Sequence, residues 1–186
     1  MLIPVLGMDP SMSNWGLAAA DLCLTSGCLE TPRLTLVKPK VQSGKQVRQN
    51  SKDLQRAEDL ATTVAIEARK AKVVFVECPV GSQSARAMAS YGMCVGILGS
   101  LRAEGVQLIE VTPSEVKVAL SGDAHATKQA MIDTAVAEYP EANWPMHRGS
   151  ISGARAEHLA DAIGAIHAGV HTPVFKNLMN ILKGIS

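Results

Sequence analysis

Near the beginning of the chain stands the stretch Val5-Leu6-Gly7-Met8-Asp9-Pro10-Ser11-Met12-Ser13-Asn14-Trp15-Gly16. The apolar residues before Asp9 predict a buried strand, and Pro10 and Ser11 break it before a second apolar run begins. A carboxylate at the mouth of a strand, fixed on a rigid sheet but facing solvent, is well placed to hold a metal ion. The alternative interpretation is a hairpin turn in which Asp9 only bonds the local backbone.

Length and composition indicate one folded domain. The chain has 186 residues, of which 47% are hydrophobic, so it can bury a sizeable core and is not a disordered chain. Aromatic residues make up only 3%, so the core must be built mainly from aliphatic side chains. The net charge of +1 argues against a uniformly basic nucleic-acid binder but leaves room for a local basic face.

The ends and the cysteines indicate the cellular setting. The N-terminus does not resemble a signal peptide, and no stretch reaches the ~20 apolar residues that a transmembrane helix needs. We therefore expect a cytoplasmic protein without a membrane partner. The cysteines show no CxxC pair, so we expect reduced, mostly buried thiols and no zinc site; they are Cys23, Cys28, Cys78 and Cys94.

The order of the predicted elements gives the fold class. Three consecutive strands are predicted at 2–9, 15–23 and about 28–37. The connections between them are short, which favours antiparallel neighbours. Strands and helices then alternate, with a helix at about 52–71 capped by Ser51, a strand at 73–77, a helix at 83–103 and a strand at 106–111. The prediction is an α/β fold with a mixed five-stranded sheet flanked by helices.

A basic loop and a helix of small residues each allow two interpretations. Residues 38–52 contain Lys45 and Arg48 among five cations and no acid, so they form either a solvated connection or an arm that contacts a polyanion. The helix at 83–103 is rich in Gly and Ala, which suits either tight packing on the sheet or a dimer interface.

The later helices carry further candidate residues. Thr112 and Glu115 predict a capping box before a helix that contains Lys117. Lys128 stands near the start of the helix at about 127–138, where it opposes the helix dipole; a bound anion would explain the position, although a single exposed lysine is commonly just solvated. Residues 140–153 are expected to form a loop.

The helix predicted at 154–167 completes a group of acids. His158 and Asp161 are three residues apart and share one helix face. Which of Glu157 and His158 faces a metal is left open by the sequence. Asp9 and Glu77 both end strands, so three carboxylates and an imidazole meet if those strands are neighbours. Such oxygen-rich donors suit Mg²⁺ or Mn²⁺, and two such ions can activate a water and stabilise the leaving oxygen of a phosphodiester.

Four motifs follow one another along the chain: Gly-Met-Asp-Pro at 7–10, Val-Phe-Val-Glu at 74–77, Thr-Pro-Ser-Glu-Val-Lys at 112–117, and His-Leu-Ala-Asp-Ala at 158–162. Each is weak alone. In order and spacing together they resemble the RuvC-type Holliday junction resolvases of the RNase H-like superfamily, from residue 5 to about residue 169. The small size and modest charge are similar to those of phage-encoded members.

The resemblance implies an RNase H-like nuclease domain at 1–170, followed by an amphipathic helix at 171–186 that belongs to the same domain or to a dimer interface. It implies a homodimer that makes paired Mg²⁺-dependent nicks in opposed strands of a four-way DNA junction. Each active site would hold two ions, and Mn²⁺ could substitute for Mg²⁺. The implied location is the cytoplasm of a bacterium or of a phage-infected host. The family's catalytic metal ligands fall on Asp9, Glu77, His158 and Asp161. Its two basic residues near the active site match Lys117 and Lys128, and we add Lys45 and Arg48 as candidate DNA contacts.

The sequence departs from this family at one position and leaves rivals. Val80 stands where bacterial members often have an aromatic residue that contacts a junction base, so we expect a weak or altered sequence preference. The rivals are an actin-like ATPase, a non-catalytic junction-binding protein, and a related nuclease that cuts other branched DNA or RNA–DNA hybrids.

Overall fold

The computed structural model describes residues 1–40, 48–81 and 83–184. Its centre is a five-stranded sheet in the order β3-β2-β1-β4-β5, in which β1, β2 and β3 are antiparallel and β4 and β5 run parallel to β1. This is the predicted mixed sheet. The strands are β1 (Leu2–Asp9), β2 (Trp15–Cys23), β3 (Arg33–Val37), β4 (Val73–Glu77) and β5 (Leu108–Val111).

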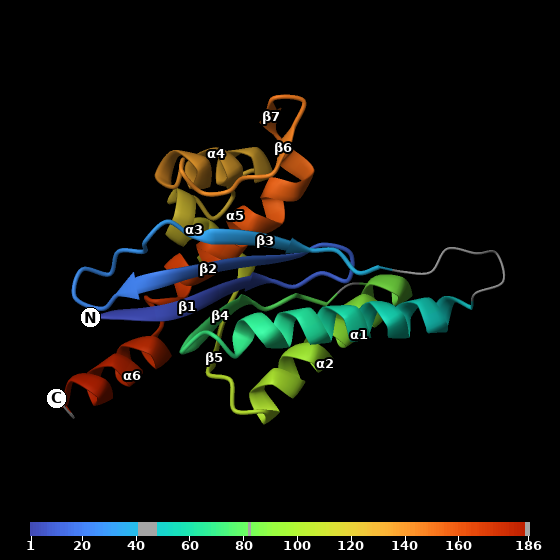
Figure 1. The fold of residues 1–186 in the computed structure, drawn as a ribbon, viewed down its shortest axis with the longest axis horizontal. Coiled ribbons are helices and arrows are strands. Elements are labelled where there is room, and N and C mark those ends of the chain that lie inside the picture. Colours follow the sequence, from blue (N-terminus) through green and yellow to red (C-terminus); the bar gives the residue numbers. More distant parts are fainter. Residues whose placement is uncertain (41–47, 82, 185–186) are drawn as a thin grey trace.

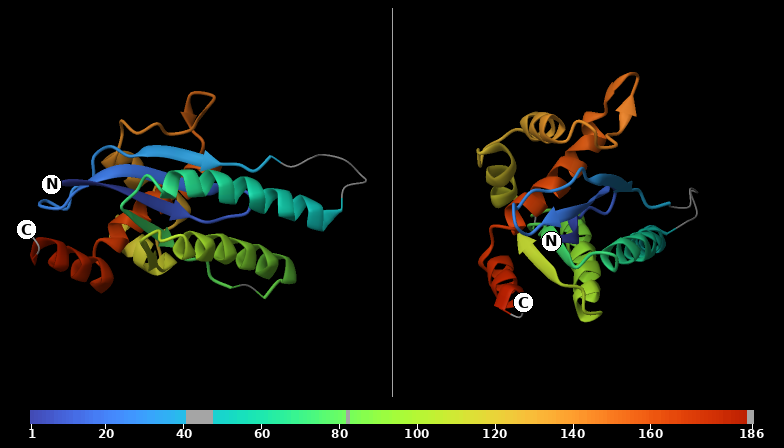
Figure 2. Two further views of the ribbon diagram at one scale, coloured as in Figure 1. Left: turned by 60° about the horizontal axis from the view of Figure 1, so that its bottom comes forward. Right: turned by 60° about the vertical axis from the view of Figure 1, so that its left-hand side comes forward.

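Helices cover both faces of the sheet (Figure 1). One face packs against α1 and α2, and the other packs against α5. Helices α3 and α4 pack against α5, and α6 follows α5 at the end of the chain (Figure 2). The helices are α1 (Gln49–Ala68), α2 (Ala85–Ala103), α3 (Pro113–Ser121), α4 (Lys128–Glu138), α5 (Gly153–Gly169) and α6 (Pro173–Gly184).

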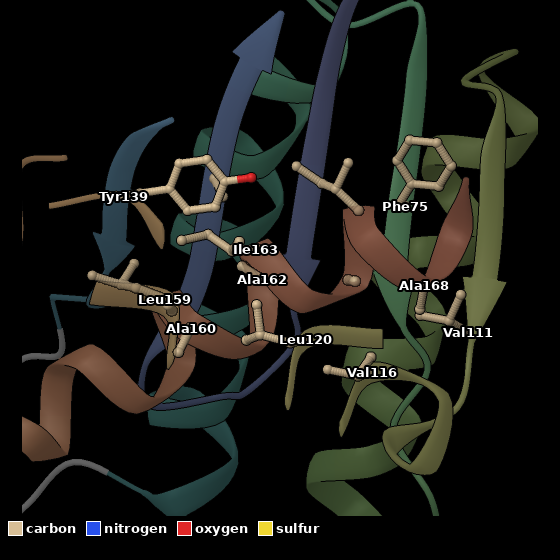
Figure 3. Close-up of a cluster of buried hydrophobic side chains, with 14 of the residues drawn as sticks. Phe75, Val111, Val116, Leu120, Tyr139, Leu159, Ala160, Ala162, Ile163 and Ala168 are labelled. Carbon is tan, nitrogen blue, oxygen red and sulfur yellow. The ribbon is translucent and has the colours of Figure 1, made fainter. Parts of the chain in front are cut away.

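The two helical layers enclose two aliphatic cores, as the low aromatic content predicts. Figure 3 shows part of the α5 side, where Leu159 and Ile163 of α5 lie in the same buried cluster as Val116 and Leu120 of α3. Helix α6 joins this core, because Phe175 and Met179 are buried in it and the ring of Phe175 meets that of Phe75 edge-on with centroids 5.3 Å apart.

Two glycines let α5 lie directly on the sheet. A Cβ at Gly7 would stand 1.9 Å from the backbone oxygen of Ala162, and a Cβ at Gly16 would stand 2.1 Å from that of His158. Any side chain at either position would push the helix away from the strands. Gly7 and Gly16 therefore set the height at which α5 holds its polar residues above the sheet edge.

Several helix and strand limits differ from the prediction for local reasons. Helix α1 begins at Gln49 after Arg48, without a side-chain cap, so the prediction of Ser51 as its cap was wrong. Strand β3 begins at Arg33, directly after Pro32, which lacks the N–H that a ladder needs. The capping box of Thr112 and Glu115 is confirmed.

The segment predicted as a loop at 140–153 contains a hairpin of β6 (Met146–His147) and β7 (Ser150–Ile151). It is preceded by two anchors. The amide of Asn143 accepts from the N–H of Leu34 at 2.7 Å and donates to its carbonyl at 2.9 Å. The indole of Trp144 is buried and donates to the carbonyl of Tyr139 at 2.9 Å.

None of the helices in the described ranges combines the length and the apolar character needed to cross a membrane.

Candidate functional site

The site lies at the edge of the sheet where β1 and β4 end. These strands are parallel neighbours, and their register pairs Met8 with Val76. Asp9 and Glu77 each come one residue later, so the two carboxylates leave the sheet side by side at its carboxyl edge. The condition under which these two acids would meet, that their strands are neighbours, is thus fulfilled.

Helix α5 brings His158 to the same edge. Its Nδ1 lies 2.5 Å from Oδ2 of Asp9, and the two side chains are 20% and 14% exposed. This bond raises the pKa of His158, and the negative charges of Asp9, Glu157 and Asp161 act in the same direction against the effect of burial. The imidazole is therefore held as a cation partner of Asp9 over a wider pH range than a free histidine.

Burial and like charges perturb the other two carboxyl groups. Burial, reinforced by the charges of Asp161 and Asp9, raises the pKa of Glu77 to about 8. Burial, reinforced by Asp9 and Glu157, raises the pKa of Asp161 to about 7. The acids therefore form one electrostatic group, in which burial first and mutual repulsion second raise the pKa values of Glu77 and Asp161 to neutral pH or above.

Two lysines border this acidic group. The ammonium of Lys117, on α3, opposes the rise in the pKa of Glu77. Lys128, at the start of α4, forms an ion pair with Glu157, and their side chains are 77% and 24% exposed. The sequence left open which of these adjacent residues faces the acids. In the structure His158 faces Asp9, while Glu157 faces Lys128. The sequence analysis missed this ion pair; the lysine at the start of a helix was its one signal.

The basic end of α1 is fixed near the beginning of α2. The guanidinium of Arg86 donates to both carboxylate oxygens of Asp53 at 2.6 and 2.8 Å, which holds the pKa of Asp53 well below its usual range. Arg48, directly before α1, is exposed. Lys45 lies outside the described residues. Val80, three residues after Glu77, is 70% exposed, so its apolar side chain is open to solvent.

The donor types at this edge fit a divalent cation. Carboxylate oxygens are the ligands that Mg²⁺ prefers, and Mn²⁺ also accepts imidazole. A cation would relieve the repulsion that raises the pKa values of Glu77 and Asp161. Within the described ranges, however, no three His, Cys, Asp or Glu side chains surround one ion position. Asp9 is bonded to His158 in this arrangement, so a cation at Asp9 would compete with the imidazole for the carboxylate.

The acidic group is not part of the cavity of about 480 Å³ between α3 and the end of α5. That cavity is mostly apolar and is lined by residues such as Val118, Ala168 and Pro173. A small apolar ligand would suit it better than a phosphate would, so it does not compete with the sheet edge as a site for phosphodiester chemistry.

Comparisons with known proteins give a structural match alone. No family model and no curated protein matches the sequence. A structure described as T. thermophilus RuvC in complex with Holliday junction substrate matches with a TM-score of 0.61 and 19% identity, covering 94% of this chain and 96% of that chain. A second Thermus thermophilus RuvC structure matches with a TM-score of 0.62 and 22% identity over 95% and 96% of the two chains.

The chain has the fold of RuvC. The match to RuvC extends over nearly the whole of both chains, so the sheet, its flanking helices and their order are shared. The predicted fold class is confirmed by this likeness and by the strand order. At this level of identity the RuvC match establishes the fold, and the chemistry rests on the side chains at the sheet edge.

Proposed function

We propose that this chain is a metal-dependent endonuclease that resolves four-way DNA junctions. The observation that carries the proposal is the gathering of Asp9, Glu77, His158 and Asp161 at the carboxyl edge of a sheet with the RuvC fold. The match to a RuvC structure in complex with Holliday junction substrate supports the choice of substrate.

In this proposal Asp9, Glu77 and Asp161 hold Mg²⁺, and Mn²⁺ substitutes for it. When bound, such an ion activates a water and stabilises the leaving oxygen of a phosphodiester. His158, the present partner of Asp9, would serve as a further ligand of such an ion or would orient the attacking water. The rigid edge formed by β1 and β4 keeps the carboxylates close enough to act together.

The two lysines neutralise phosphate charge. Lys117 already faces Glu77, so a phosphate near the acids would meet its ammonium. Lys128 is mostly exposed despite its ion pair with Glu157, so its ammonium remains accessible to a strand that crosses the sheet edge. Arg48, directly before α1, extends the proposed contacts along the DNA. Lys45, which lies outside the described residues, is proposed as a contact from the sequence alone.

The outer face of α2 supports a homodimer. A Cβ placed at Gly92, Gly96 or Gly99 would have nothing within 4 Å, so packing inside the chain does not require these glycines. They share an exposed face with Ala89 and Val95. The tight-packing interpretation of this small-residue helix is therefore wrong for these glycines, and we propose that the face meets a second copy, which would supply the second active site for paired nicks.

A substrate panel tests the proposed function. The purified chain is incubated with a four-way junction, a flap, a linear duplex and an RNA–DNA hybrid, each with Mg²⁺, with Mn²⁺ and with a chelator. We expect symmetric nicks in the junction with either metal, none with chelator, and little cutting of the duplex. Preferential cutting of the hybrid or flap would transfer the proposal to those substrates.

The same panel with Asp9→Asn distinguishes cleavage by this chain from cleavage by a contaminating nuclease and from junction binding without cleavage. Cleavage by the wild type but not by the variant, with equal junction affinity for both, supports the proposal. Tight junction binding by the wild type without any metal-dependent nicking would instead indicate a non-catalytic junction-binding protein.

A further inference from the structure

The β6–β7 hairpin projects from the body of the molecule beside the beginning of α5 (Figures 1 and 2). Its pairs are Met146 with Ile151 and His147 with Ser150, so only Arg148 and Gly149 form the turn. Its base is fixed, because Ser152 donates to the carbonyl of Pro145 at 2.8 Å and the buried Trp144 precedes it. The hairpin is therefore a short, anchored projection.

The turn residue Arg148 has a backbone conformation that arginine rarely adopts. Its φ is 48° and that of Gly149 is 82°, the pattern of a type I′ turn. Asn at the first position would fit such a turn with less strain. Arginine is therefore not the residue that the fold itself favours at the tip.

The tip offers side chains that the described part of the chain leaves without partners of their own. The Arg148 guanidinium makes no ion pair within the described ranges, and Met146 is 57% exposed. An exposed cation beside an exposed flexible apolar side chain is suited to a phosphate and the sugar next to it.

Positive charge continues from the tip to the acidic group. The sequence from Ala142 to Ala156 contains no Asp or Glu. Arg155, exposed in the first turn of α5, lies three residues before His158 and hence on the same side of the helix. Arg148 in the hairpin and Arg155 at the start of α5 are thus two exposed cations in an acid-free segment that ends just before Glu157, which is itself paired with Lys128.

We propose that the β6–β7 hairpin is a second DNA contact, in which Arg148 holds the backbone of the duplex arm that flanks the cut phosphate. Met146 packs against the neighbouring sugars, and Arg155 bridges the hairpin and the site. The inference rests on the proposed function, because it assumes that a junction lies across the sheet edge. It adds an element and a residue whose loss would weaken binding without touching the acids.

Binding is measured by fluorescence anisotropy with a labelled four-way junction in chelator, so that no cleavage is needed. Arg148→Asn keeps a residue that the turn accepts, so we expect an unchanged or higher Tm. Loss of one phosphate contact should raise the Kd by about fivefold and reduce the slope of log Kd against log salt concentration by about one. Arg148→Lys should retain most of the affinity.

Arg69→Ala is the matched control, because Arg69 is equally an exposed arginine but pairs with Glu104 beyond the last residue of α1, at the opposite edge of the sheet. It should leave the Kd and the salt slope unchanged. As an independent measurement, a photo-reactive residue at position 148 should cross-link to a junction arm in chelator.

The outcomes separate this inference from the function. A wild-type chain that does not bind junctions overturns both. Normal junction binding with no change in Kd or salt slope for Arg148→Asn, or with no cross-link from position 148 to DNA, overturns the hairpin contact and leaves the nuclease proposal standing.

Discussion

His158 and Asp9, separated by 149 positions in the chain, lie 2.5 Å apart between Nδ1 and Oδ2. Each is the partner of the other, so a metal ion must compete with an imidazole for the Asp9 carboxylate. The close approach depends on Gly16, which lets the backbone of His158 rest on β2. This relationship makes the electrostatics of the edge measurable without any cleavage assay.

Replacing Asp9 by Asn should lower both the cleavage rate and the pKa of His158. Cleavage should fall by ~100-fold or more, since even an outer partner of a metal ligand typically contributes 10–100-fold. Since the bond from Asp9 is the largest cause of the raised pKa of His158, that pKa should fall in the variant. NMR titration of the His158 ring protons measures it, and an unchanged pKa would contradict the bond seen in the structure.

The stability of the chain in chelator should decrease as the pH rises. The folded pKa values of about 8 for Glu77 and about 7 for Asp161 exceed their ordinary values of 4.5 and 3.8. A carboxyl with a raised folded pKa stabilises the fold below its unfolded pKa, and that contribution is lost as the pH rises through the folded value. We therefore expect Tm in chelator to decline between about pH 4 and about pH 8.

Mg²⁺ should reverse that decline, because it neutralises the ionised carboxylates. Glu77→Gln should stabilise the chelated protein at pH 8 by on the order of 2 kcal/mol, since it removes a charge whose burial is unfavourable. Thermal unfolding at pH 6 and pH 8, with chelator or Mg²⁺, measures both effects. A Tm that is flat with pH and indifferent to Mg²⁺ would argue against a metal site at this edge.

The ion pair of Lys128 with Glu157 should restrain DNA binding. A phosphate must draw the ammonium away from Glu157, and Glu157 itself repels the strand. Glu157→Gln should therefore tighten the junction Kd by about two- to fivefold at low salt. In the Lys128→Ala background the same change should have a smaller effect; an equal gain in both backgrounds would mean that Glu157 acts only by general repulsion.

A charge on the outer face of α2 should prevent the proposed dimer. Val95 is 37% exposed among the glycines of that face, so Val95→Glu should give a monomer by light scattering and abolish paired nicking. Ile66→Glu is the control, because Ile66 is a 50% exposed apolar residue of another helix, α1. A wild-type chain that is monomeric on its own and on a junction would remove this part of the proposal.

The sequence predicted the sheet well because its strands end on distinctive breakers. Asp9 followed by Pro10, and Glu77 followed closely by Pro79, mark the same edge, and the parallel register of β1 and β4 brings them together. The β6–β7 hairpin escaped prediction because its strands are two residues long and its turn begins with Arg148 rather than Asn. Glu157 and His158 point in different directions on any helix, but which of them faces Asp9 is decided by how α5 docks on the sheet.

The side-chain amide of Asn143 occupies both backbone groups of Leu34 on the outer strand β3. An unprotected strand at the border of a sheet is a template on which another chain can add a strand and start aggregation. The Asn143 amide makes at Leu34 the two hydrogen bonds that an added strand would make, so these backbone groups are already occupied. Self-association through sheet extension is thereby discouraged at β3, one of the two border strands of the sheet.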